Sequence, residues 1–266
     1  MEHPRFLQGA RERAQQLRSR FGERFGYVLE ADILLLLAAT AATLFVFATV
    51  ADQVFAGRTH AFDEQVMLLL RSPEDRSQPL GPRWLQEMMR DYTGLGSTGV
   101  LLVLVGIVAG FLALIGKRGS AVLVVALTAT GVALANLAKL GFERPRPDLV
   151  PHAVAVHSLS FPSQHALMSA VVYLTLGALI ARTQERRNIK IYVMSVAMLL
   201  TALVGISRVY LGVHWPTDVL AGWALGAAWA SLCWLIAIWL QRRGTIDEPT
   251  DVRAATSSRV EADRAS

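Results

Sequence analysis

Long stretches without a charged residue alternate with polar segments along this chain of 266 residues. Six such stretches stand out, and most are close to the ~17–25 residues that a helix needs to cross the hydrocarbon core of a bilayer. They cover residues 33–51, 92–116, 119–138, 166–181, 191–207 and 219–241. The fourth is the shortest, and it reaches span length only with Ser163 and His165 at its polar end. The pattern predicts an all-α integral membrane bundle of six transmembrane helices.

The residues before the first span predict an amphipathic helix, because apolar residues recur there at three- and four-residue spacing. They are Phe6, Ala10, Ala14, Leu17, Phe21 and Phe25, and arginines occupy much of the other face. Such a helix would lie among cytoplasmic lipid headgroups, and a disordered basic tail is the alternative. We therefore predict a basic amphipathic segment over 1–30, a six-span domain over 31–241 and a disordered cytoplasmic tail over 242–266.

The polar segment over 52–91 carries two short apolar clusters. The first contains Phe62, Val66, Met67 and Leu70, and the second contains Trp84, Leu85, Met88 and Met89. Three prolines lie between them, at positions 73, 79 and 82. This pattern predicts two short helices that lie flat on the outer surface of the bundle.

Small residues in the spans predict where helices pack closely. Gly106 with Gly110 and Gly222 with Gly226 have the four-residue spacing that lets two helix backbones approach. The single cysteine, Cys233, falls inside the sixth span, where we interpret it as a packing residue. With one cysteine the chain can form no intramolecular disulfide and no thiolate metal cluster.

Composition supports the membrane interpretation and argues against a nucleic-acid partner. Hydrophobic residues make up 53% of the chain and charged residues 18%, against roughly 25% charged in soluble domains. The net charge is +5, but the basic residues lie between apolar stretches rather than in one patch with aromatic residues. Of 26 Lys and Arg residues, 17 fall in the set of alternate loops that includes both termini. Both termini are therefore predicted to be cytoplasmic, with the lipid bilayer as the surrounding partner.

Ionisable and polar residues gather at the ends of four spans. Lys139, Arg144 and Arg146 follow the third span, Ser163 and His165 open the fourth, and a third group surrounds the boundary between the fifth and the sixth. That third group contains Arg208, His214 and Asp218. Because successive spans cross in opposite directions, all three groups must lie on one face of the membrane. The charge count places that face outside.

The combination of three cations with two imidazoles and a carboxylate suits a phosphoryl group. Lys139, Arg146 and Arg208 match the charge and the acceptor oxygens of phosphate. Taken singly, each could be a side chain that reaches for lipid headgroups, and a lone histidine is usually a packing residue. Arg144 stays undecided between phosphate, Glu143 and solvent, and we assign no role to the other histidines. Those are His3, His60, His152 and His157.

His214 and Asp218 are four residues apart, which on a helix places them on one face. Asp218 could then hold one ring nitrogen of His214 and leave the other directed at phosphorus as a nucleophile. His165, on another helix, could donate a proton to the leaving oxygen, so a bell-shaped pH dependence is expected. Pro162 and Pro216 are predicted in the first turn of their helices.

These motifs, read in order, resemble the type 2 phosphatidic acid phosphatase superfamily, also called lipid phosphate phosphatases. The family's phosphate-binding residues fall on Lys139, Arg146, Ser163 and Arg208. Its acid histidine falls on His165, its nucleophile on His214 and its orienting aspartate on Asp218. The second motif usually has glycine where this chain has Gln164, whose amide could instead contact the phosphate.

The resemblance implies a metal-independent hydrolase with no cofactor that acts through a phosphohistidine on a membrane lipid phosphate or diphosphate. Undecaprenyl diphosphate, phosphatidylglycerophosphate and phosphatidate are the candidate substrates. The pocket is also similar to that of vanadium-dependent haloperoxidases, which are typically soluble. Two other functions stay open, namely a lipid phosphotransferase using the same site and a non-catalytic anionic-lipid binder or transporter. The oligomeric state is not predicted.

Overall fold

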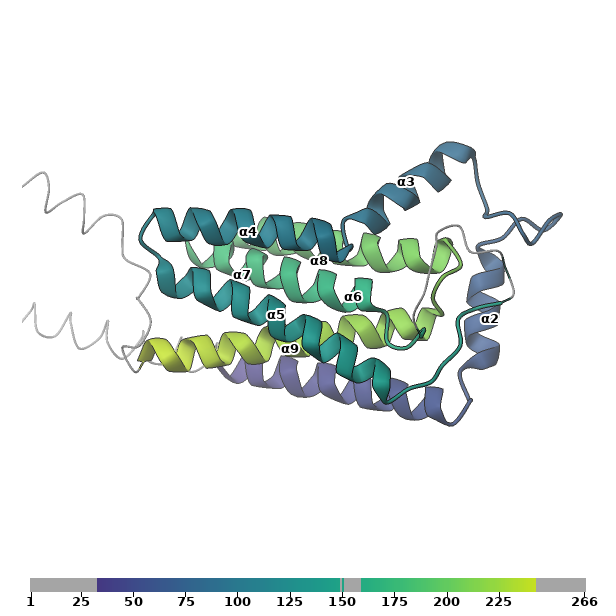
Figure 1. The fold of residues 1–266 in the computed structure, drawn as a ribbon, viewed down its shortest axis with the longest axis horizontal. Helices are drawn as coiled ribbons and strands as arrows, with labels where there is room; N and C mark the ends of the chain where they lie inside the picture. Colours follow the sequence, from purple (N-terminus) through teal and green to yellow (C-terminus); the bar gives the residue numbers. More distant parts are fainter. Residues whose placement is uncertain (1–32, 149, 151–158, 243–266) are drawn as a thin grey trace, which may run out of the picture.

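The computed structural model describes residues 33–148, 150 and 159–242, which form an elongated bundle of helices (Figure 1). The predicted amphipathic segment over 1–30 lies outside the described residues, as does nearly all of the predicted tail over 242–266. Within the described part the chain is helical, with one isolated β-bridge between Arg71 and Pro79 and no sheet. The all-α prediction is confirmed.

The helices follow the predicted order. They are the first helix Ile33–Phe55, α2 (His60–Leu69), α3 (Arg83–Gly94), α4 (Thr98–Leu114), α5 (Arg118–Leu140), α6 (Gln164–Ser169), the π-helix η1 (Ala170–Leu174), α7 (Thr175–Arg182), α8 (Arg187–Tyr210) and α9 (Pro216–Arg242). The segments α6, η1 and α7 form one continuous span, Gln164–Arg182. Of the described helices, five are long and apolar enough to cross a membrane, and a bent pair would make six. The chain is thus a multi-pass integral membrane protein.

The bent pair corrects the predicted second span over 92–116. The helix breaks between Gly94 and Thr98, and α3 and α4 meet at 53°. Ser97 caps α4 by accepting a hydrogen bond from the Val100 amide. Gly96 lies in close contact with α8, because a Cβ there would come within 2.3 Å of Val204. The break went unpredicted because uncharged residues continue through it.

Two short helices form where they were predicted, although α3 runs past residue 91 to Gly94 and projects from the bundle instead of lying flat on it (Figure 1). In Figure 1, α2 lies across one end of the bundle, and α3 projects from α4 at that same end. Met67 of α2 is fully buried, and so is the carboxylate of Asp63 on the same helix. A buried acidic residue on a surface helix was not expected, and it bears on the site described below.

One of the two predicted glycine contacts forms. A Cβ at Gly222 would lie 2.6 Å from the Ser163 carbonyl oxygen, and one at Gly226 would lie 2.4 Å from that of Leu167. Glycine at both positions therefore lets α9 pack directly on the start of α6. The prediction for Gly106 and Gly110 is wrong, since in the described part of the chain no other segment comes within 4 Å of a Cβ built at either residue.

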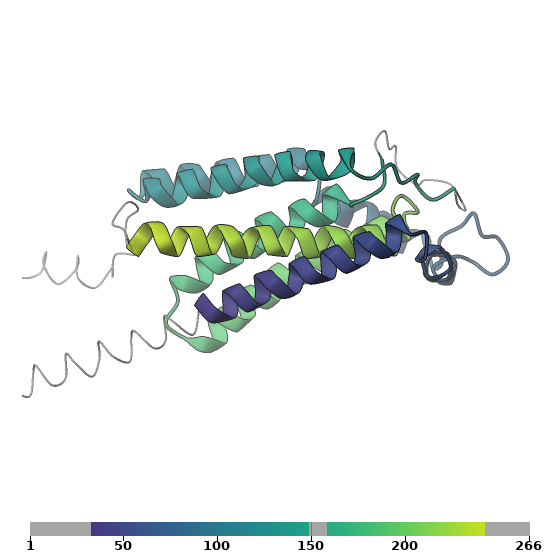
Figure 2. The ribbon, with the colours of Figure 1, turned by 90° about the horizontal axis from the view of Figure 1, so that it is seen from below.

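The first helix packs along α9, where Thr40 donates a hydrogen bond to Ser231 at 2.8 Å (Figure 2). Cys233 is buried in the largest apolar core cluster, consistent with a packing role.

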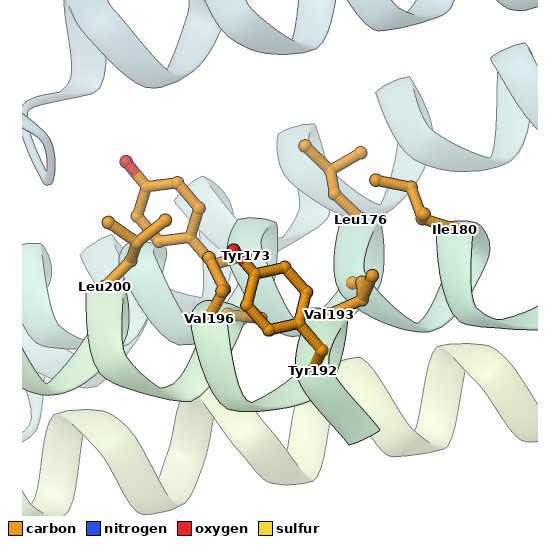
Figure 3. A pocket seen from close by; sticks show the side chains of 9 residues that line it. Tyr173, Leu176, Ile180, Tyr192, Val193, Val196 and Leu200 are labelled. Atoms are coloured by element: carbon orange, nitrogen blue, oxygen red, sulfur yellow. The ribbon is translucent and has the colours of Figure 1, made fainter. Parts of the chain in front are cut away.

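An apolar pocket of about 260 Å³ lies between η1, α7 and α8 (Figure 3). Its lining includes Tyr173, whose hydroxyl donates to the Leu95 carbonyl at 2.7 Å, but no predicted site residue. Its lining suits hydrocarbon rather than a phosphate group.

Candidate active site

All three polar groups of the sequence meet at one end of the bundle. The carboxyl ends of α5 and α8 and the amino ends of α6 and α9 lie together there, and α2 lies across this end (Figure 1). The loop from Phe142 to Asp148 runs across the same end. The predicted co-location of the three groups is therefore present in the fold.

The three predicted cations surround one region of this end. Lys139 and Arg208 are 9% and 4% exposed, and Lys139 interacts electrostatically with both Arg146 and Arg208. Thr93 of α3 accepts a hydrogen bond from Arg208 at 2.8 Å, and the Val213 carbonyl accepts one from Arg146 at 2.6 Å. Side chains that reach for headgroups would point outward. These three are held inward, where their mutual repulsion favours a bound anion.

Among the described residues, two polar atoms in this region are buried and have no hydrogen-bond partner, namely the Ser163 hydroxyl oxygen and Nε of Arg208. Such buried groups are rare in folded proteins and call for a physical explanation. Both belong to the predicted phosphate-binding set, and phosphate oxygens would satisfy them. Gln164, the other residue predicted at this position, opens α6 and is partly exposed.

His214 and Asp218 meet, although not on a helical face as predicted. α9 begins at Pro216, so Asp218 lies in its first turn and His214 in the preceding loop. The Asp218 carboxylate still reaches His214, with 3.5 Å between Nδ1 and Oδ2. Pro216 takes the predicted first-turn position. Pro162 does not, because α6 begins two residues later, at Gln164.

The Asp218 carboxylate is fully buried, and both of its oxygens accept hydrogen bonds. Its Oδ2 accepts from the Ser160 hydroxyl at 2.5 Å and from the Trp215 amide at 2.9 Å, and its Oδ1 accepts from Arg144 at 2.6 Å. The Ser160 oxygen also lies 3.4 Å from Nδ1 of His214. Ser160 therefore connects the aspartate to the imidazole, a role that no spacing in the sequence indicated.

These contacts define the protonation of His214. Asp218 and Ser160 both accept from a protonated Nδ1. Nε2 lies 3.3 Å from Nη1 of Arg146, and this guanidinium nitrogen can only donate, so Nε2 carries the lone pair. Burial lowers the pKa of His214 from 6.5 to about 4; Arg208 and Arg146 add to the shift and Asp218 opposes it. The neutral imidazole thus directs its lone pair from Nε2 toward the cations.

His165 is the second residue of α6, and it interacts electrostatically with Arg208, His214, Lys139 and Arg146. The break between α3 and α4 packs against it, since a Cβ at Gly96 would lie 3.3 Å from the His165 carbonyl oxygen. The two histidines, predicted from separate motifs, therefore share one site.

Arg144, which the sequence left undecided, is placed by the fold. Its side chain is only 13% exposed, and within the described part of the chain its ion-pair partners are the buried carboxylates Asp63 and Asp218, each at 2.6 Å, rather than Glu143. The fold and this end of the bundle thus define a multi-pass membrane protein whose buried cations and oriented imidazole suit a phosphoryl group.

Comparison with known proteins places this class within a family. The PAP2 superfamily model matches residues 120–242. Phosphatidylglycerophosphatase B of Bacillus subtilis (strain 168) is 36% identical over 146 residues, which cover 54% of this chain and 70% of that protein. The undecaprenyl-diphosphatase of Sulfolobus acidocaldarius is also 36% identical, over 98 residues that cover 37% of this chain and 41% of that protein.

A solved structure agrees with these sequence matches. The crystal structure of a transmembrane PAP2 type phosphatidylglycerolphosphate phosphatase from Bacillus subtilis superposes with a TM-score of 0.62 at 30% identity. The match covers 77% of this chain and 96% of that one. The chain belongs to the PAP2 superfamily. It is a lipid phosphate phosphatase, as the sequence motifs indicated.

Proposed function

We propose that this protein hydrolyses a lipid phosphate or diphosphate through a phosphohistidine formed on His214, at the outer face of a cell membrane. The observation that carries the proposal is the orientation of His214. Its Nδ1 faces Asp218 and Ser160. Its Nε2 faces Arg146, which with Lys139 and Arg208 forms the cation cluster. An imidazole held in this way is a neutral nucleophile aimed at the position of an anion.

In the first step, Nε2 of His214 attacks phosphorus and the bond from phosphorus to the lipid oxygen breaks. Lys139, Arg146 and Arg208 stabilise the charge on the other phosphate oxygens, and the Ser163 hydroxyl and the amides at the start of α6 assist them. Gln164 adds an amide side chain at the same rim. His165 donates a proton to the departing alkoxide or phosphate, and Asp218 stabilises the imidazolium formed at His214.

In the second step, His165 takes a proton from water, and the oxygen of that water attacks the phosphorus held on His214. The bond from phosphorus to Nε2 breaks, and inorganic phosphate leaves with His214 restored to its neutral form. The scheme needs neither a metal nor a cofactor, since the three cations supply the positive charge that a metal would otherwise provide.

The topology that fits this proposal has six spans, with the bent pair α3 and α4 counted as one. Both termini are then cytoplasmic, because 17 of the 26 basic residues lie in the loops on that side. The site opens on the opposite face, so a lipid would present its phosphate to the cations while its chain stays among the helices.

The identity of the substrate is the first property to determine. Relatives at the same 36% identity are named for phosphatidylglycerophosphate, for undecaprenyl diphosphate and, in Mycobacterium tuberculosis, for decaprenylphosphoryl-5-phosphoribose. We propose phosphatidylglycerophosphate first, because that match covers the largest share of a relative. Release of inorganic phosphate from purified protein, with a panel that includes undecaprenyl diphosphate and phosphatidate, tests this order. No release from any of them would contradict the proposed reaction.

Chelation provides a second test. We expect phosphate release to stay within about twofold of its initial rate after dialysis against EDTA, since Lys139, Arg146 and Arg208 supply the charge. The measurement compares dialysed protein with and without added Mg²⁺. A loss of activity that a divalent cation restores would replace the proposed mechanism with metal chemistry.

The pH dependence follows from the burial of His214. Since its pKa is lowered to about 4, the imidazole stays neutral well below the ordinary 6.5 and becomes protonated only as the pH falls through that lower value. The decrease of kcat/KM toward acidic pH that is caused by the enzyme, and not by the substrate, is therefore expected below pH 6.5, the ordinary pKa of histidine.

The measurement is kcat/KM against pH, with the ionisation of the substrate phosphate determined separately by titration. An acidic limb of the enzyme at or above pH 6.5 would contradict a buried, neutral His214 as the attacking group.

A further inference from the structure

Behind the predicted catalytic residues, two buried carboxylates share one guanidinium. Arg144 donates from Nη1 to Oδ1 of Asp218 and from Nη2 to Oδ2 of Asp63, both at 2.6 Å. The side chains of the two aspartates are fully buried. Arg144 also donates to the hydroxyls of Thr217 and Thr59, at 2.8 and 3.2 Å. Its terminal nitrogens are therefore already engaged with protein oxygens.

Asp63 fixes this arrangement from outside the bundle. Its Oδ1 accepts from the Thr217 amide at 2.9 Å, and its Oδ2 accepts from the Thr217 hydroxyl at 2.7 Å. Thr217 is the second residue of α9 and is adjacent to Asp218. Asp63 on α2 thus holds both the turn that carries Asp218 and the guanidinium that contacts it.

The two oxygens of Asp218 consequently have separate partners. Oδ1 faces Arg144, whereas Oδ2 receives Ser160, the Trp215 amide and, at 3.5 Å, Nδ1 of His214. A carboxylate held at one oxygen cannot rotate freely, so the contact from Arg144 sets the direction in which the other oxygen meets the imidazole. Arg144 also stacks over Trp215, 5.4 Å from the ring centroid.

We propose that Asp63 and Arg144 are positioning residues for the phosphatase reaction, acting through Asp218 to hold His214 in its attacking orientation. The inference rests on the proposed function of His214. It extends the site to α2, which carries Asp63. This helix lies outside residues 120–242, the part of the chain that matches the family model. The short helix over the end of the bundle is then part of the catalytic support.

Asp63→Asn is the first test. Asparagine has one oxygen, so it cannot accept from the Thr217 amide, the Thr217 hydroxyl and Arg144 as the carboxylate does. We expect kcat to fall about tenfold, while KM and the inhibition constant of inorganic phosphate stay within about twofold, because the phosphate-binding cations are untouched.

The matched control is Asp52→Asn. Asp52 pairs with Arg58 at 2.7 Å before α2, but both side chains are largely exposed. We expect wild-type kinetics for this variant, since exposed ion pairs contribute little. An Asp63→Asn variant with wild-type kcat would overturn the proposal. So would one whose loss lies wholly in KM or in phosphate affinity, which would make Asp63 part of the phosphate pocket.

The second test asks whether the effect passes through Asp218. In an Asp218→Asn background, adding Asp63→Asn should reduce kcat by no more than about twofold further, since residues that act as one unit are not additive. A full second tenfold loss in the double variant would mean that Asp63 acts independently of Asp218, and it would overturn the inference.

Arg144→Gln is expected to lose more activity than Asp63→Asn, because it leaves two buried carboxylates without their shared cation. If this variant unfolds in a thermal melt, the Asp63→Asn and Asp218→Asn cycle carries the test alone. Failure of the inference is distinct from failure of the proposed function. An active His214→Ala variant would disprove the assignment of His214 as the nucleophile. An inactive His214→Ala variant beside a fully active Asp63→Asn variant would disprove only the positioning role of Asp63.

Discussion

Replacing His214 by alanine is expected to lower phosphate release by at least about 10⁴-fold, the scale on which loss of a catalytic nucleophile or base acts. The side chain is 1% exposed and is the imidazole whose Nε2 meets the cation cluster. Asp218 keeps its bonds to Ser160, Trp215 and Arg144 in the variant, so the fold should survive. The measurement is turnover of the best substrate of the panel, with thermal melting to verify folding.

His60→Ala is the matched control for this prediction. His60 lies at the same end of the bundle, pairs with Glu64 at 3.2 Å and is largely exposed. Its removal should leave turnover near the wild-type value. A chemical readout accompanies the rate: acid-labile, alkali-stable radiolabel should remain on wild-type protein quenched during turnover of a phosphorus-labelled lipid. Wild-type turnover by His214→Ala, or equal labelling of that variant, would exclude His214 as the nucleophile.

The long helices could be predicted from the sequence because each must satisfy one requirement, an apolar length that spans the bilayer. The same criterion could not locate the break at Gly96. The chain leaves the helical conformation at Ser97, which caps α4, and Gly96 packs against Val204; a pattern of uncharged residues reveals neither feature. The contact of Gly222 with α6, by contrast, was indicated by its spacing to Gly226, although an identical spacing at Gly106 led to no contact.

The convergence of Lys139, His165 and Arg208 could be predicted because alternate span ends share one side of a membrane. Which side chains support them could not be predicted, since Ser160 and Asp63 are distant in the sequence from the residues they contact. One signal for Asp63 was present. It precedes Met67 by four residues and Leu70 by seven, so it lies on the apolar face of α2. A carboxylate on that face needs a buried partner, and Arg144 supplies it.

The relation of His214 to Asp218 shows how a prediction can reach the right contact by the wrong geometry. A four-residue spacing on a helix was assumed, yet only Asp218 is helical. Its carboxylate instead turns back over the start of α9 and accepts from the Trp215 amide, as a residue in the first turn of a helix can. The loop that carries His214 is held to the helix by this bond.

Asp218→Asn should reduce kcat by about 10⁴-fold, by analogy with the loss of the orienting aspartate in a serine protease triad. Asparagine has a single acceptor oxygen for the four groups that now contact the carboxylate: Ser160, the Trp215 amide, Arg144 and His214. If its NH₂ group faces the imidazole, Nδ1 becomes the acceptor and the proton moves to Nε2. The attacking lone pair is then lost, although the ring stays in place.

The measurement that distinguishes this effect from misfolding is the inhibition constant of inorganic phosphate. Lys139, Arg146 and Arg208 hold the anion in the proposed site, so phosphate should inhibit Asp218→Asn within about threefold of the wild-type value despite the lost turnover. Asp75→Asn, an exposed carboxylate bonded to Ser77 within a turn, is the matched control and should be fully active. A kcat near the wild-type value in Asp218→Asn, beside an inactive His214→Ala, would mean that Ser160 alone orients the imidazole.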